Sequence, residues 1–155
     1  MPDALYFEDF PLGEVVEYGR VDVSVDQILA FAREFDPQPF HTNEEAARDT
    51  FAGGLIASGW HTASVLMRMM CDGFLNRSTS QGGPGVEELD WTRPVRPGDR
   101  LRARRTTLSA RALRSRPTLG LVEFQFEVFN QNAEIVMRQR NTIFFLRRSP
   151  GEAAS

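Results

Sequence analysis

The second half of the chain carries the hydrophobic pattern of an antiparallel sheet. In residues 121–130 apolar and polar side chains alternate, which predicts a strand with one buried face. Three further stretches are also predicted strands: residues 84–95, 100–110 and 134–146. Turns are predicted at residues 94–98 and 130–133, where proline, glycine and asparagine gather. A valine-rich stretch at residues 13–23 adds a fifth strand from the first half.

The segment 60–75 has a different pattern, that of a helix which is apolar around most of its circumference. Apart from Thr62, its polar positions form one narrow stripe: His61, Ser64, Arg68 and Asp72. Such a helix is buried on most sides, and in a small domain a curved sheet wrapped around it provides that burial. The sequence therefore predicts an α+β fold, an antiparallel sheet of about five strands around a long central helix.

Proline residues divide the segment between the first strand and this helix. Ser24 and Gln27 have the spacing of a capping box, so a helix begins there and ends near residue 35, because Pro37 disfavours helical geometry before it. Residues 36–41 are predicted to form a stiff, non-helical loop. A second capping box, Thr42 with Glu45, predicts a short helix up to residue 48.

The length and the absence of repeats or linkers fit one domain. We assign residues 1–148 to it and predict a disordered tail at residues 149–155, which are small and polar.

The chain has 155 residues and a formal net charge of −3. All 18 basic residues are arginine, which excludes a Schiff-base lysine and a phosphate-binding P-loop lysine. Arginines cluster in residues 93–116, so we expect an anionic ligand rather than a nucleic acid.

The apolar segments are too short to cross a membrane, which takes about 20 residues. Residues 1–10 carry acidic but no basic side chains, so we do not expect a signal peptide. The single cysteine, Cys71, forms no internal disulfide, and a cytoplasmic location is the simplest expectation.

Asp36 and His41 are the first candidates for chemistry. A carboxylate and an imidazole held on a proline-stiffened loop suit general acid–base catalysis on a water molecule. In the alternative interpretation, Asp36 caps a local turn and His41 caps the next helix. His61 is interpreted as a core histidine bonded to a backbone carbonyl, and two histidines without further ligands predict no metal site.

Ser58 and Gly59 precede the central helix. A free backbone amide at a helix N-terminus is a ready donor to a developing oxyanion, such as a thioester enolate. Alternatively, Gly59 only permits close packing of Trp60.

Together these residues resemble the MaoC-like dehydratase family, which includes (R)-specific enoyl-CoA hydratases. Its pattern Asp-x-Asn-Pro-x-His is matched by residues 36–41, with Gln38 in place of the usual asparagine. The glycine-rich stretch 51–59 matches next, with Ser58 in place of the usual histidine, and residues 94–99 resemble a family turn. The resemblance covers roughly residues 10–147.

The resemblance implies a hotdog fold and the reversible addition of water to a trans-2-enoyl-CoA. Asp36 and His41 would hold and activate the water, and the Gly59 amide would stabilise the enolate. Coenzyme A is then part of the substrate, with no separate cofactor, and a homodimer or larger assembly is implied. Substrate contacts are expected from five residues: Phe40, Ser58, Trp60, Arg93 and Arg96. Of these, Arg93 and Arg96 are expected at the phosphates of coenzyme A.

Two alternatives remain open. A hotdog acyl-CoA thioesterase has a carboxylate on or near the central helix, where Asp72 is the only acid. A non-catalytic acyl-CoA-binding module would not need the intact Asp36–His41 pair.

Overall fold

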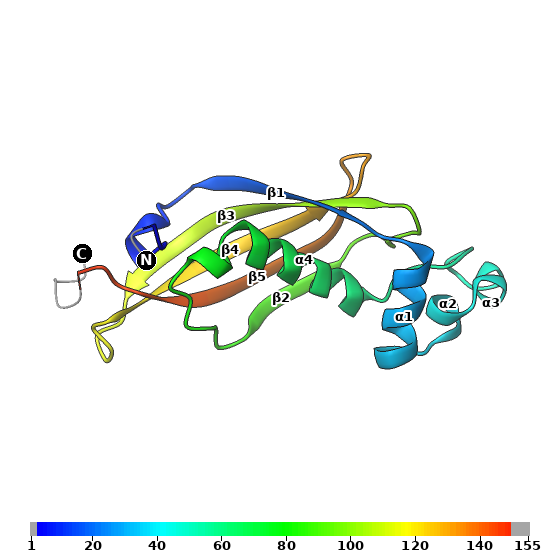
Figure 1. Ribbon diagram of the computed structural model, residues 1–155, viewed down its shortest axis with the longest axis horizontal. Coiled ribbons are helices and arrows are strands. Elements are labelled where there is room, and N and C mark those ends of the chain that lie inside the picture. Colours follow the sequence, from blue (N-terminus) through cyan, green and yellow to red (C-terminus); the bar gives the residue numbers. More distant parts are fainter. Residues whose placement is uncertain (1–2, 150–155) are drawn as a thin grey trace.

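The computed structural model describes residues 3–149, which form a five-stranded antiparallel sheet curved against one long helix (Figure 1). The strands are β1 (Val15–Asp22), β2 (Val86–Trp91), β3 (Arg100–Ala112), β4 (Leu119–Phe129) and β5 (Ile135–Leu146). Their order in the sheet is β1-β3-β4-β5-β2, and every pairing is antiparallel. The α+β hotdog prediction is confirmed. Residues 150–155 of the predicted tail lie outside the described residues.

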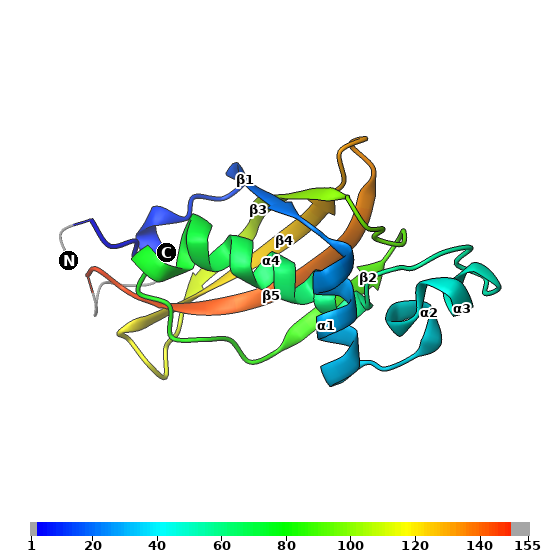
Figure 2. The ribbon, with the colours of Figure 1, turned by 45° about the vertical axis from the view of Figure 1, so that its right-hand side comes forward.

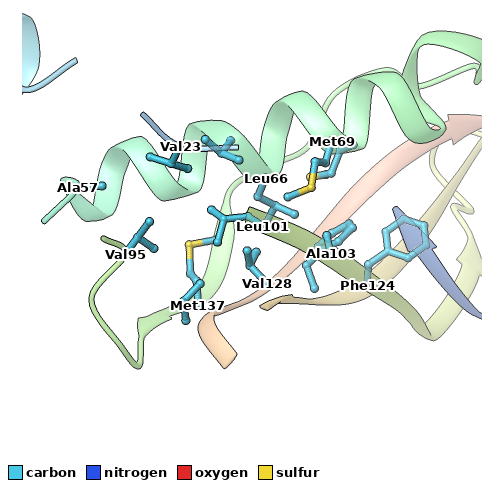
Figure 3. Close-up of a cluster of buried hydrophobic side chains, with 14 of the residues drawn as sticks. Val23, Ala57, Leu66, Met69, Val95, Leu101, Ala103, Phe124, Val128 and Met137 are labelled. Atoms are coloured by element: carbon cyan, nitrogen blue, oxygen red, sulfur yellow. The ribbon is translucent and has the colours of Figure 1, made fainter. Parts of the chain in front are cut away.

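The core lies between the sheet and helix α4 (Gly59–Gly73), as Figure 3 shows. On β4 the inward-facing side chains are fully buried: Val122, Phe124, Phe126 and Val128. Leu66 and Met70 of α4 are equally buried and belong to the same hydrophobic cluster. The alternation along β4 thus identified the inner face of the sheet correctly.

Helix α4 is less enclosed than its sequence suggests. Trp60 is 60% exposed and Met67 is 49% exposed, although both are apolar. The prediction that the sheet buries α4 on most sides is wrong for these two side chains, whereas no other apolar side chain of the helix is exposed. Figure 2 shows that the sheet lies on one side of the helix.

Three short helices lie at the end of the domain where α4 begins, away from the described ends of the chain (Figures 1 and 2). They are α1 (Val25–Phe35), α2 (Pro39–Thr42) and α3 (Glu44–Arg48). Two 3₁₀ turns, η1 (Phe7–Asp9) and η2 (Leu75–Arg77), complete the elements of the described chain. The capping box of α1 is present, since the Gln27 amide donates to Ser24 Oγ at 3.2 Å and the Ser24 amide donates to Gln27 Oε1 at 2.9 Å.

Two local predictions need correction. Residues 36–41 are not wholly non-helical, because Pro39 is the first residue of α2; a helix start needs no amide hydrogen there, and the fixed proline φ suits it. The cap of α3 is Asn43, whose Oδ1 accepts from the Ala46 amide at 2.9 Å, rather than Thr42. The Thr42 hydroxyl instead donates to the Gln38 carbonyl at 3.1 Å.

The arginines of β3 alternate between the two faces of the sheet, as predicted. Arg102 and Arg104 point outward, where both guanidinium groups lie over the Phe129 ring. Arg105 points inward, is 3% exposed, and forms an ion pair with Glu14 among aromatic rings. Arg105 is therefore a structural residue and is not available to an anionic ligand.

Candidate active site

A buried segment between α3 and α4, residues 55–58, holds the elements of the site together. The Ile56 amide donates to the Phe40 carbonyl at 3.1 Å, and the Ala57 amide donates to the Val95 carbonyl at 2.8 Å. All four residues of segment 55–58 are buried. This segment therefore joins α2, the 94–98 turn and the start of α4 into one rigid unit.

Asp36 stands where α1 ends. Its amide still donates to the Ala32 carbonyl at 2.8 Å, but Pro37 prevents the helix from continuing. The carboxylate accepts from Gln38 Nε2 at 2.7 Å on Oδ1 and from Ser58 Oγ at 2.7 Å on Oδ2. The two residues that depart from the family pattern thus both hold this carboxylate.

The environment of Asp36 keeps it ionised. Burial disfavours the charged form and alone would raise the pKa of Asp36, but hydrogen bonds from Gln38 and Ser58, together with the attraction of the His41 ring when it is protonated, outweigh it. The pKa of the Asp36 carboxyl is therefore lowered from its ordinary value.

His41 faces this carboxylate in a fixed orientation. Its Nδ1 lies 2.7 Å from the Ile56 carbonyl oxygen, and its Nε2 lies 3.3 Å from Asp36 Oδ2. A carbonyl only accepts, so the proton of a neutral ring resides on Nδ1 and Nε2 is an acceptor. Nε2 and Oδ2 are then two adjacent acceptors, placed so that one water molecule can donate to both.

Gly59 is the first residue of α4. Within residues 3–149 its amide donates to no other group, whereas the next amide, of Trp60, donates to Ser58 Oγ at 3.3 Å. Its carbonyl accepts from Trp91 Nε1 at 2.8 Å. A side chain at position 59 would collide with the ring, since a Cβ there would lie 2.4 Å from Trp91 Cε2. The close packing partner of Gly59 is therefore Trp91, and not Trp60 as the alternative interpretation held.

These groups open onto one cavity of about 500 Å³. Six of the residues expected at the site line it: Asp36, Phe40, His41, Gly59, Trp60 and Arg93. Ser58 does not line this cavity, because the residue is only 1% exposed and its hydroxyl donates to Asp36. We therefore correct its expected role: Ser58 positions the Asp36 carboxylate and does not contact the substrate. Arg96 lines a neighbouring cavity of about 390 Å³, which shares Arg93 and Pro94 with the first.

Neither a metal site nor a membrane span emerges from the described chain. No group of three histidine, cysteine or acidic side chains within residues 3–149 could hold a metal ion. No helix in that range is long and apolar enough to cross a membrane.

The family is decided by comparison with known proteins. Residues 9–122 match the family model described as MaoC like domain. The chain belongs to the MaoC-like family. A crystal structure of a MaoC-like dehydratase from Rhodospirillum rubrum is 42% identical, covers 94% of this chain and 99% of its own, and superposes with a TM-score of 0.86.

Other MaoC-like relatives are more distant. The uncharacterized protein YdeM of Bacillus subtilis is 29% identical over 124 residues, which is 80% of this chain and 86% of that protein. The unliganded R-hydratase PhaJ1 of Pseudomonas aeruginosa is 22% identical, with a TM-score of 0.74, over 92% of this chain and 86% of that chain. At that identity the likeness concerns the fold.

Sequence reasoning missed two aromatic residues of this MaoC-like site. Trp91 and Phe51 both line the cavity, and Phe51 packs edge-to-face on Phe40 with 5.4 Å between ring centroids. Trp91 lies three residues before Pro94 of the proline-rich turn, and Phe51 opens the glycine-rich stretch. Their nearness to these motifs was the available signal.

His61 differs from its predicted environment. Its Nδ1 is buried without a hydrogen-bond partner in the described chain, and its ring stacks on Phe31 with 4.9 Å between centroids. The predicted backbone carbonyl partner is therefore wrong. Burial lowers the pKa of His61, so the ring is neutral at neutral pH.

Gln38→Leu is expected to raise the pKa of Asp36, because the burial remains while one donor to the carboxylate is lost. A carboxyl with a lowered folded-state pKa stabilises the fold above its unfolded-state pKa and loses that contribution as the pH falls through the folded value. In Gln38→Leu this contribution should therefore be smaller, and its loss should be complete at a higher pH than in the unaltered protein. Carbon-13 NMR titration of the Asp36 carboxyl and acid unfolding measure both effects. Gln125→Leu, on the outward face of β4, is the control, and an equal shift there would contradict the prediction.

Proposed function

We propose that this MaoC-like protein adds water reversibly to the double bond of a trans-2-enoyl-CoA. The observation that carries the proposal is the pair of acceptors, Asp36 Oδ2 and His41 Nε2, on a cavity that is also lined by Gly59, whose amide has no acceptor in the described chain. An activated water and an oxyanion donor in one cavity are what conjugate addition to a thioester requires.

The geometry supports a simple division of roles. Asp36, held ionised by its donors, accepts a proton from the water while the water oxygen bonds to C3 of the substrate. The electrons of the double bond move toward the thioester carbonyl, where the Gly59 amide stabilises the enolate oxygen. His41 holds the water through Nε2, and the proton that Asp36 took up is then delivered to C2, with His41 sharing in the transfer. The product is the 3-hydroxyacyl-CoA, and the reverse steps remove water.

The proposal is tested with crotonyl-CoA in two parallel assays. Hydration lowers the enoyl absorbance without releasing a thiol, so we expect the first signal and not the second. Release of free coenzyme A without hydration would instead support a thioesterase. Saturable binding without either reaction would support a binding module.

The structure gives no support to a thioesterase built on Asp72. This carboxylate is 58% exposed, forms an ion pair with Arg68 at 2.8 Å, and lies near the end of α4 opposite to Gly59. It does not line the cavity that holds Asp36 and His41.

Arg93 is the favoured contact for the phosphates of coenzyme A. It lines both neighbouring cavities, and its guanidinium lies 3.0 Å from Glu134 at the surface. Arg96 lines only the second of these cavities, and its Nη2 donates to the Ala52 carbonyl at 2.7 Å.

Arg93→Glu is expected to raise KM for crotonyl-CoA about tenfold, as for the loss of one charge-assisted hydrogen bond. KM for crotonyl-pantetheine, which lacks the nucleotide phosphates, should change much less. The salt dependence of KM should also weaken, because a screened attraction is removed. Arg116→Glu, at the exposed β3–β4 turn, is the matched control. Equal KM changes for both substrates would place the phosphates elsewhere.

We also propose a homodimer through the face formed by α4 and the edge strand β2. Two apolar side chains that do not line the cavity are exposed there: Met67 and Val86. Strand β2 pairs only with β5 in the described sheet, so its outer edge can pair with a second copy and extend the sheet.

Light scattering should therefore give twice the chain mass for the protein. Met67→Glu should lower it toward the single-chain mass, because a charge would be buried in the interface. Leu108→Glu, an exposed apolar position on β3, should leave the mass unchanged. A single-chain mass for the unaltered protein at all concentrations would rule the dimer out.

A further inference from the structure

Trp91 joins the edge of the sheet to the first turn of α4. It is the last residue of β2, where its backbone pairs with Met137 of β5. Its side chain crosses to Gly59, donating from Nε1 to the glycine carbonyl at 2.8 Å while the ring lies against the glycine Cα. The same ring meets Trp60 edge-to-face, with centroids 5.1 Å apart.

This contact fixes the Gly59–Trp60 peptide, which directly follows the free Gly59 amide in the chain. The Ser58 side chain holds the turn from one side, because its Oγ accepts from the Trp60 amide and donates to Asp36. Trp91 holds it from the other side, through a hydrogen bond and a ring that leaves no space for a Cβ. The distance between the Asp36 carboxylate and the Gly59 amide is thus set by two side chains from different parts of the sequence.

Trp91 is also placed to meet the substrate. It lines the cavity and is 45% exposed, so part of the ring is free to form a wall beside the α4 N-terminus. Trp60 and Trp91 are the two tryptophans of the chain. Both therefore report by fluorescence on whatever enters this cavity.

We propose that Trp91 is a positioning residue, which holds the Gly59 amide in place for the enolate and forms one wall of the thioester site. The expected effect of this role on kcat rests on the proposed hydration activity. An oxyanion donor acts only at the right distance from the developing charge. Loss of its positioning should therefore affect the transition state more than the bound substrate, lowering kcat rather than raising KM.

The test compares Trp91→Phe with Trp60→Phe. Trp91→Phe keeps an aromatic ring and removes the indole N–H, so kcat for crotonyl-CoA should fall about tenfold with KM within twofold. Trp60→Phe removes an indole of the same cavity that has no hydrogen bond to Gly59, so its kcat should fall much less. Light scattering of both variants must give the mass of the unaltered protein. An unchanged kcat in Trp91→Phe overturns the positioning role.

A binding measurement separates this proposal from the hydration activity. In Trp60→Phe the remaining tryptophan is Trp91, and saturated butyryl-CoA, which cannot be hydrated, should change its fluorescence saturably. If the unaltered protein fails to hydrate crotonyl-CoA but this change occurs, the proposed function is wrong while Trp91 remains a wall of a thioester site. If no change occurs, the assignment of Trp91 to that site is overturned as well.

Discussion

Asp36→Asn is expected to lower the rate of crotonyl-CoA hydration by a factor of ~10² to 10⁴, the usual contribution of a general base. The amide has nearly the size and shape of the carboxylate, so the fold should survive. What is lost is the acceptor at 3.3 Å from His41 Nε2 that takes the proton from water. Stopped-flow or steady-state absorbance measures the rate, and circular dichroism checks the fold.

The matched control for this change is Asp72→Asn. It makes the same chemical change on an exposed carboxylate whose partner is Arg68 rather than the cavity. Its hydration rate should equal that of the unaltered protein. Turnover of folded Asp36→Asn near that of the unaltered protein would remove Asp36 from the mechanism.

His41→Ala should cause a loss of similar size, ~10² to 10⁴ in rate. It also leaves the buried Ile56 carbonyl without its donor, which costs about 1–3 kcal/mol in the free energy of unfolding. Urea denaturation separates this loss of stability from the loss of chemistry.

A second variant isolates the chemical role of the ring. His41→Asn can offer its amide N–H to the Ile56 carbonyl in place of Nδ1–H, but has no group in place of Nε2. It should therefore recover stability without recovering the rate. His61→Ala alters the other histidine, which does not line the cavity, and should keep the rate. Recovery of hydration in His41→Asn would show that Nε2 takes no part.

The sequence predicted the parts of the molecule that depend on near neighbours in the chain. The alternation along β4 gave its buried face, because successive side chains of a strand point to opposite sides. Ser24 and Gln27 gave the start of α1, and Pro37 gave its end. Asp36 and His41 lie five residues apart in the proline-rich segment that follows α1. In the structure, His41 Nε2 lies 3.3 Å from Asp36 Oδ2.

Some short-range predictions failed where two local solutions compete. A proline disfavours helix before it but suits the first position of a helix after it, so Pro39 alone did not reveal α2. Thr42 and Asn43 are adjacent residues of the kind that cap helices. The Gln38 carbonyl decides which of them caps α3, because it accepts a hydrogen bond from the Thr42 hydroxyl. Asn43 is then the residue that caps the start of α3.

By itself, therefore, the sequence determined the five strands, the two longer helices, the inner face of the sheet and the candidate pair of Asp36 and His41. Only the tertiary structure decided which groups complete the site. The bond from Ser58 to Asp36 spans 22 residues and that from Trp91 to Gly59 spans 32. Contacts this distant arise from the packing of α4 on the sheet and leave no periodic trace in the sequence. Packing likewise decided that one side of α4 stays open, because exposure depends on how many strands face the helix.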